Sequence, residues 1–285
     1  MPDSHKSSRF PQGDDRRIAH EETERQTKRL IERFKENPQI IFDRYFWLDT
    51  DLDYKGGSSL SYYETFHDLL PEGTKLLKDY IEEVLKERWG DALFADFGGV
   101  GSNIAKAFTP GFFKRSFGVA LFDERFRPST EWRTEEIRAA DAALNHTVIE
   151  GDLRDPDLYE HLREELEGEK LDLLIERMGK GLEFSPTDTK TVGALLQTWY
   201  DLVREGGLML IQIPIHFNIF IQAWVEKVQR ETGGTLEIKC AIGDSDAGTD
   251  AQSVLLIHKQ PGAPAKLPML TAAEVGNLIE HDRKK

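Results

Sequence analysis

From residue 91 onward, the chain alternates short apolar runs with longer segments in which apolar residues recur at helical spacing. Continuous apolar runs predict strands buried on both faces, and apolar residues three and four positions apart predict helices that pack one face on a sheet. The predicted strands are 92–97, 117–122, 146–150, 171–176 and 207–214. The predicted helices between them are 101–108, 130–144, 155–167 and 187–204. This alternation predicts a parallel sheet covered on both faces by helices.

The pattern changes after a further predicted helix at 217–231. The runs TLEIKCAI at 235–242 and AQSVLLIHK at 251–259 are both strand-like, and only GDSDAGTD separates them. That segment is too short for a crossover helix and suits a hairpin loop, so the last two strands should be antiparallel. The sequence therefore predicts an α/β fold with a doubly wound, mostly parallel seven-stranded sheet that ends in an antiparallel hairpin.

The segments on either side of this sheet have a different character. The first residues are polar with proline and glycine, which predicts a mobile tail. They are followed by a narrow amphipathic helix at 20–36, an aromatic-rich stretch and a helix at 72–89. The last residues are proline-rich, then suit one short helix, and are predicted to dock on the core. The predicted organisation is a tail at 1–19, an N-terminal helical and aromatic extension at 20–90, a core at 91–260 and a C-terminal tail at 261–285.

Composition and charge narrow the class of protein. The 285 residues include 51 acidic and 37 basic side chains, for a formal net charge of −14. An acidic field of this size opposes binding to nucleic-acid phosphates and anionic lipid, and no basic cluster offsets it. No apolar stretch is long enough to span a membrane, and the N-terminus lacks the apolar core of a signal peptide. We therefore expect a soluble, cytoplasmic protein that binds neither nucleic acid nor membranes.

The single cysteine, Cys240, agrees with that expectation. One thiol can form neither a disulfide framework nor a zinc site. Cys240 lies in the apolar run LEIKCAI, so we expect a buried and inert thiol.

Residues that carry chemistry stand where the predicted strands end. In an open α/β sheet, ligands bind beyond the carboxyl ends of the parallel strands. The first strand ends in DFGGVG at 96–101, where glycine lets the backbone approach a ligand and a helix N-terminus offers unpaired N–H groups. Asp123 ends the second predicted strand, Asp152 follows the third, and Glu176 ends the fourth. Each feature alone could be a turn or a helix cap, but together they predict a ligand site.

Over residues 90–260, the chain resembles the class I S-adenosylmethionine-dependent methyltransferases. The first motif of that family resembles ALFADFGGVG, the second VALFD, the third GDL at 151–153, and the fifth-strand region LVREGGLMLIQIP. The closing hairpin is similar to the sixth and seventh strands of the family. The resemblance implies a Rossmann-like fold and transfer of a methyl group from S-adenosylmethionine, which leaves S-adenosylhomocysteine.

The resemblance also implies which residues bind the methionine end of the cofactor. Gly98, Gly99 and Gly101 would flank the methionine part, and Asp96 would reach its amino group directly or through water. The family's commonest spacing places glycine at every second position after the acid, whereas Val100 interrupts that spacing here. The register of the glycine turn therefore stays open.

The other strand ends would bind the rest of the cofactor. By the resemblance, Asp123 would bind the ribose hydroxyls, and Asp152 with the Leu153 backbone would hold the adenine. Glu176 would stand near the sulfonium and the methyl acceptor. These acids would form an acidic rim, which suits a donor that carries a positive sulfonium and a positive ammonium group.

Methyl transfer depends mainly on aligning the acceptor with an activated donor, so no catalytic base is obligatory. Where the acceptor must lose a proton, the candidates near the ends of the fourth and fifth strands are Glu176, Arg177, Glu183 and His216, of which we favour Glu176 and His216. Each has another interpretation. Glu176 could pair with Arg177, and His216 could be a structural histidine.

Candidates for contact with the acceptor are Arg177, Tyr62, Tyr63 and His67. Arg177 could bind an acidic acceptor or pair with a nearby acid, and the aromatic residues could cover a pocket or pack in a core. Because the N-terminal extension is rich in Tyr, Phe and Trp, we expect a small aromatic or hydrophobic acceptor. No metal is expected, because the fourth strand lacks the paired acid and amide of metal-dependent family members. The sequence makes no prediction of the oligomeric state.

Two other functions remain open. An NAD(P)-dependent oxidoreductase would share the glycine turn, but Ile104 stands where a dinucleotide fingerprint has its third glycine, and the terminal hairpin is not expected of such an enzyme. A non-catalytic partner subunit would bind S-adenosylmethionine without transferring its methyl group.

Overall fold

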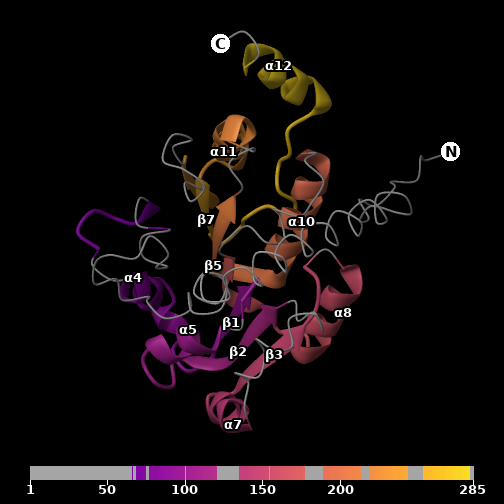
Figure 1. The fold of residues 1–285 in the computed structure, drawn as a ribbon. Coiled ribbons are helices and arrows are strands. Elements are labelled where there is room, and N and C mark those ends of the chain that lie inside the picture. The colour runs from indigo at the N-terminus through magenta and orange to yellow at the C-terminus, as the bar shows by residue number, and fades with distance from the viewer. Residues whose placement is uncertain are drawn as a thin grey trace, which may run out of the picture.

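The computed structural model of the chain describes residues 66, 69–74, 77–99, 101–120, 135–153, 155–176, 189–213, 218–242 and 253–282. Within these residues, strands form one sheet in the order β3-β2-β1-β4-β5-β7-β6 (Figure 1). The strands are β1 (Ala92–Phe97), β2 (Phe113–Ala120), β3 (His146–Glu150), β4 (Leu171–Glu176), β5 (Val203–Ile213), β6 (Leu236–Ala241) and β7 (Ser253–Lys259). The helices are α4 (Leu77–Val84), η2 (Lys86–Arg88), α5 (Ser102–Ala107), α7 (Glu135–Ala143), α8 (Pro156–Glu165), α10 (Thr189–Leu202), α11 (Asn218–Thr232) and α12 (Ala272–Asp282).

Strands β1 to β5 run parallel to one another, so their carboxyl ends lie at one edge of the sheet. β7 is antiparallel to both β5 and β6. This arrangement confirms the predicted mostly parallel seven-stranded sheet with a terminal antiparallel hairpin.

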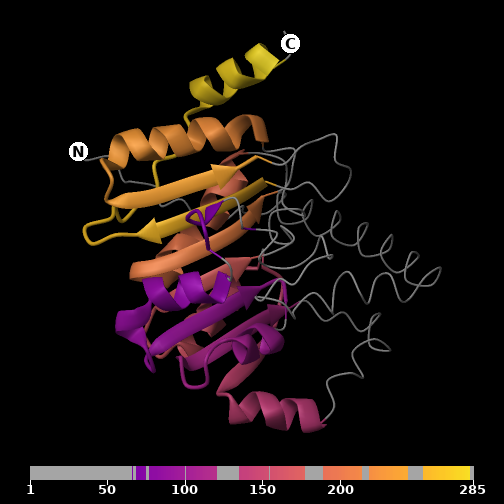
Figure 2. The ribbon, with the colours of Figure 1, turned by 90° about the vertical axis from the view of Figure 1, so that its left-hand side faces the viewer.

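Helices cover both faces of the sheet, and each face buries its own apolar core (Figure 2). On one face, α4 and α5 pack on the strands. Core residues on this face include Leu77, Ile81, Phe94, Ile104, Leu173 and Ile175. On the other face, α8, α10 and α11 pack on the strands. Core residues there include Phe97, Tyr159, Leu174, Trp199 and Val228. Burial on both faces explains why β1 and β4 are mostly apolar in the sequence, apart from the acids Asp96, Asp172 and Glu176.

The predicted bounds of β1, β3 and β4 agree with the structure, but β2 and β5 begin earlier than predicted. β2 begins at Phe113. The charged residue Arg115 does not interrupt the strand, because its side chain is hydrogen-bonded. Its guanidinium donates to the carbonyl of Glu165 at 2.8 Å. β5 begins at Val203. Gly206 and Gly207 lie inside the strand, and glycine is uncommon in strands, so the pattern predicted a later start. A Cβ on Gly207 would lie 2.6 Å from the Val203 side chain, so the chain needs glycine inside the strand.

The helix predicted at 72–89 is shorter in the structure. Gly73 has a φ of +85°, and the Thr74 N–H donates to the Pro71 carbonyl at 3.1 Å, so these residues form a turn. α4 ends at Val84, before the single turn η2. The predicted helix at 20–36, the aromatic-rich stretch and the hairpin loop at 243–250 lie outside the described residues.

A buried carboxylate ties three strands together at the edge opposite their carboxyl ends. Asp172 of β4 is fully buried and accepts from the Leu93 N–H of β1 at 2.8 Å. It also accepts from Arg88 Nε at 2.9 Å and from Arg204 NH1 of β5 at 3.1 Å. Hydrogen bonds and charge partners of this kind compensate the removal of the carboxylate from water.

The C-terminal residues pack against α10 and α11. Tyr200 Oη donates to the Pro264 carbonyl at 2.7 Å, and Trp224 Nε1 donates to the Pro268 carbonyl at 2.6 Å. The chain then forms α12, which lies outside α11 (Figures 1 and 2). No helix among the described residues is long and apolar enough to cross a membrane.

Candidate functional site

The glycine turn after β1 needs glycine at two positions. Gly98 has a φ of +88° and Gly101 a φ of +68°, both in the left-handed region that side chains disfavour. The Gly98 N–H donates to the Val119 carbonyl of β2 at 2.8 Å, and Gly101 is the N-cap of α5. Gly99 has no such backbone requirement among the described glycines. The conformation of the turn therefore depends on glycine at positions 98 and 101, whereas its register against the family motif stays open.

Gly101 is also closely packed, so a side chain there would require its neighbours to shift. A Cβ there would lie 3.0 Å from the Asp96 Cβ and 3.2 Å from His146 Cε1. His146 is buried on β3, and its Nδ1 shares a hydrogen bond of 2.8 Å with the Ser116 hydroxyl. The glycine turn thus rests on Asp96 and on a buried histidine.

The loop after β3 contains the predicted adenine-binding residues Asp152 and Leu153. Asp152 is half-buried and Leu153 is buried. Asp155 Oδ1 accepts from the Asp157 N–H at 3.0 Å, so Asp155 caps α8. The alternative that Asp152 supplies this cap is therefore wrong.

A chain of buried hydrogen bonds links this loop to α8 and α10. Tyr159 Oη of α8 donates to the Leu153 carbonyl. Trp199 Nε1 of α10 donates to Tyr159 Oη at 2.8 Å. Burial, together with the negative charges of Asp152 and Glu176, raises the pKa of the Tyr159 phenol. Tyr159 therefore stays protonated and keeps its hydrogen for the Leu153 carbonyl.

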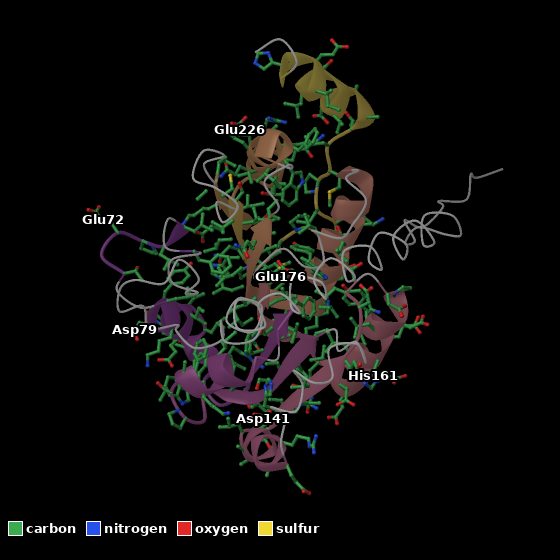
Figure 3. The ribbon with its side chains drawn as sticks, in the orientation of Figure 1. Glu72, Asp79, Asp141, His161, Glu176 and Glu226 are labelled. Atoms are coloured by element: carbon green, nitrogen blue, oxygen red, sulfur yellow. The ribbon has the colours of Figure 1, made fainter. Side chains whose placement is uncertain are left out.

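Glu176 ends β4 and is fully buried. Figure 3 shows it near the middle of the molecule, with ribbons around it. In the sheet it is paired with Phe97 of β1, which packs edge-on against Trp199 with ring centroids 5.8 Å apart. The carboxylate therefore lies on the face covered by α8 and α10, close enough to Tyr159 to affect its pKa.

Asp96 and Glu176 project from opposite faces of the sheet. Asp96 is paired with Ile175 and Phe97 with Glu176, and successive side chains in a strand alternate between faces. Both acids are buried. These two acids of the expected acidic rim are therefore enclosed in the structure and lie on different faces of the sheet. Asp96 lies on one face of the sheet at the end of β1, and Glu176 lies on the other face at the end of β4. Gly101 of the glycine turn lies close to Asp96.

Several predicted residues lie outside the described part of the chain. They are Asp123, Arg177, Glu183, His216, Tyr62, Tyr63 and His67. Their roles stay predictions. Among the described residues, no group of three or more His, Cys, Asp or Glu side chains is placed to hold a metal ion. Cys240 is half-buried on β6, and burial raises the pKa of its thiol.

Sequence reasoning missed Tyr159 and Trp199. Both occupy apolar positions on helix faces, where an aromatic residue predicts only packing in the core. A buried tyrosine hydroxyl or indole N–H usually needs a hydrogen-bond partner. This requirement could have indicated that Tyr159 and Trp199 take part in buried hydrogen bonds. The requirement does not name the partner, because Trp199 lies far along the chain from Tyr159.

The sheet has five parallel strands and a reversed strand β7 between β5 and β6, which is the strand arrangement that the resemblance to class I methyltransferases implies. No family model matches the sequence, and no curated protein matches it. Similar solved structures exist, at low identity.

Three of these structures illustrate the likeness. A S-adenosylmethionine-dependent methyltransferase from Clostridium acetobutylicum is 11% identical with a TM-score of 0.43, over 79% of this chain and 99% of its own. An rRNA methylase from Streptococcus thermophilus is 15% identical with a TM-score of 0.39, over 63% and 93%. Precorrin-6y C5,15-methyltransferase from Geobacter metallireducens is 12% identical with a TM-score of 0.39, over 66% and 89%. At these values the likeness concerns the arrangement of strands and helices and does not bear on the substrate.

Proposed function

We propose that this protein transfers a methyl group from S-adenosylmethionine to an acceptor. The observation that carries the proposal is the arrangement at the carboxyl edge of the parallel strands. Asp96 lies near the end of β1 and the glycine turn follows that strand, the Asp152–Leu153 loop follows β3, and Glu176 ends β4. Ligands of open α/β sheets bind at this edge. The reversed strand β7 favours this function over a nicotinamide-dependent oxidoreductase.

The residues present fit the cofactor chemically. Carboxylates suit the ammonium and sulfonium charges and the ribose hydroxyls, and the turn at Gly98 and Gly101 holds the backbone without side chains beside Asp96. The Leu153 carbonyl accepts from Tyr159 Oη, and we assign the Leu153 N–H to the adenine. When bound, S-adenosylmethionine supplies an electrophilic methyl group.

The chain itself contributes position and exclusion of water. Glu176 lies among Phe97, Tyr159 and Trp199, in a buried region where electrostatic interactions are stronger than in water. It would orient the acceptor or hold a proton released by it. Alignment of the acceptor with the methyl group would supply most of the lowering of the barrier.

We propose a small aromatic or hydrophobic molecule as the acceptor. The support comes from the sequence, because the N-terminal extension is rich in aromatic residues and the net charge of −14 opposes binding to polyanions. RNA is the competing acceptor class. A direct test of transfer separates the two.

The experiment follows labelled methyl from S-adenosylmethionine into separated small-molecule, RNA and protein fractions of a cell extract. We expect label in the small-molecule fraction. Gly99→Arg should abolish transfer, because it introduces a large cation into the turn. Gly276→Arg is the matched control. It adds the same side chain on α12, where nothing lies within 4 Å of a Cβ, and should leave transfer unchanged.

The outcomes separate the parts of the proposal. Label in RNA would overturn the small-molecule acceptor and keep the methyltransferase. Absence of label from every fraction, with S-adenosylmethionine still bound, would favour a non-catalytic partner subunit. Stabilisation by NAD(P) and not by S-adenosylhomocysteine in a thermal-shift assay would favour the oxidoreductase.

A further inference from the structure

The loop between β3 and α8 is held by contacts with α8. Gly151 lies so close to Leu158 that a Cβ would be 2.6 Å from Leu158 Cδ1. The Asp155 N–H donates to the Asp152 carbonyl at 2.8 Å, which closes a turn across the loop. These contacts hold the two ends of the loop. The position of its centre depends on the contacts of Leu153.

Leu153 is held at two points. Its side chain is buried in the core under α8 and α10. Its carbonyl accepts from Tyr159 Oη, which belongs to the first turns of the same helix that the loop enters. The backbone of the loop is thus tied to a side chain that lies beneath it, and the Leu153 carbonyl is directed inward.

Trp199 in turn fixes the orientation of the Tyr159 hydroxyl. The indole Nε1–H donates to Tyr159 Oη at 2.8 Å, so it occupies an acceptor position of the oxygen and leaves the hydroxyl hydrogen for Leu153. The indole has no acceptor nitrogen, so the direction of this chain of hydrogen bonds cannot reverse. Tyr159 is also packed against Phe97 of β1, with ring centroids 6.3 Å apart.

We propose that Tyr159, oriented by Trp199, is a positioning residue that holds the Asp152–Leu153 loop in the conformation that binds the adenine of the cofactor. This inference rests on the proposed function, and it adds a link that neither the motif nor the resemblance contains. The hydroxyl touches neither cofactor nor acceptor. It acts through the Leu153 backbone, so its removal should weaken cofactor binding and leave the chemical step intact.

The link also joins two parts of the molecule. Trp199 belongs to α10, the helix that precedes β5 on the face where Glu176 lies. Tyr159 belongs to α8, which follows the loop. The chain Trp199–Tyr159–Leu153 therefore connects the helix behind Glu176 to the adenine loop through two hydrogen bonds.

The test compares Tyr159→Phe with Tyr200→Phe, a matched control. Tyr200 is also a buried tyrosine whose hydroxyl donates to a backbone carbonyl, that of Pro264, but this bond lies at the C-terminal segment. Tyr200→Phe removes one hydrogen bond, whereas Tyr159→Phe removes two and leaves the Trp199 N–H without this partner, so Tyr159→Phe should lose more stability. Only Tyr159→Phe should weaken binding of S-adenosylhomocysteine and of 5′-methylthioadenosine, each by about five- to tenfold in Kd. Its KM for S-adenosylmethionine should rise while kcat is retained.

Trp199→Phe provides a second variant, because it leaves the Tyr159 hydroxyl and removes its orienting donor, together with part of a buried ring. We expect a smaller loss of affinity than for Tyr159→Phe. Amide hydrogen exchange of the ligand-free protein adds a readout that needs no cofactor. Amides of residues 151–155 should exchange faster in Tyr159→Phe and at the wild-type rate in Tyr200→Phe.

Failure of this inference is distinguishable from failure of the proposed function. If the wild-type protein binds S-adenosylhomocysteine and Tyr159→Phe binds it equally well, the role of Tyr159 is overturned alone. If binding falls to the same extent in Tyr200→Phe, the effect is one of stability and the role is also overturned. If the wild-type protein does not bind the cofactor, the methyltransferase proposal is overturned. The role of Tyr159 in cofactor binding is then overturned as well.

Discussion

Gly101 and Gly111 show how two glycines with similar backbones differ in their surroundings. Gly101 has a φ of +68° and Gly111 a φ of +80°, so a side chain is disfavoured at both. Nothing lies within 4 Å of the position of a Cβ on Gly111. At Gly101 that position is crowded by Asp96, His146 and the Phe117 carbonyl.

Alanine substitutions separate the backbone effect from the packing effect. Gly111→Ala should lower the free energy of unfolding by about 1–2 kcal/mol, because only the backbone conformation is disfavoured. Gly101→Ala should lower it by about 1–3 kcal/mol more, because the new methyl group must displace buried neighbours. Equilibrium unfolding in denaturant measures both. Equal losses in the two variants would show that the space around Gly101 is not restricted.

At the residue scale, the sequence predicted features that depend on neighbours along the chain. The acid and the glycine turn of 96–101 follow each other directly, so their place at the end of β1 could be predicted. The bond from Tyr159 to Leu153 joins nearby residues but depends on how α8 turns back over the loop. The bond from Trp199 depends on the packing of α10, which the local pattern does not encode.

The C-terminal helix α12 illustrates the same distinction at the scale of an element. The sequence TAAE at its start forms a capping box, in which the Thr271 N–H donates to Glu274 Oε2 at 2.7 Å and the Glu274 N–H donates to Thr271 Oγ1 at 3.3 Å. Glu274 also accepts from Lys227 Nζ of α11 at 2.8 Å. Local sequence predicts the cap, whereas the contact with α11 needs the fold.

The docking of α12 should depend on pH through Glu274. Hydrogen bonds from Lys227 and from Thr271 lower the pKa of Glu274 from 4.5 to about 2. Because the folded pKa lies below the unfolded one, the stabilisation is present above about pH 4.5 and is lost as the pH falls towards 2. Lys227 also contacts Glu231, at 3.8 Å, so that acid becomes its remaining partner.

Hydrogen exchange at pH 5 and pH 3 measures this effect. The amides of α12 should lose protection relative to those of β4 as the pH falls. Glu274→Gln should reduce the protection of α12 already at pH 5 and remove most of the difference between the two pH values. If the variant keeps the full wild-type pH dependence, other groups control the docking of α12.

For the whole molecule, the order of apolar runs predicted the class of fold well, because strands buried on both faces leave an unmistakable apolar pattern. The bounds of β2 and β5 were harder to predict, since Arg115 and Gly207 sit inside strands for reasons of three-dimensional contact. The face on which each acid projects was also not predicted. Asp96 and Glu176 both end strands, and only the pairing of β1 with β4 shows that they point to opposite sides.

The central claim is that the carboxyl edge of β1, β3 and β4 binds S-adenosylmethionine, and calorimetric titration with S-adenosylhomocysteine tests it most directly. We predict saturable binding of one ligand per chain, with NAD showing none. Asp152→Ala should weaken the binding by at least about tenfold. Glu150→Ala, which removes the same charge from an exposed position on the same strand end, should leave it unchanged. Absence of binding by the wild-type protein, or equal binding by Asp152→Ala, would contradict the claim.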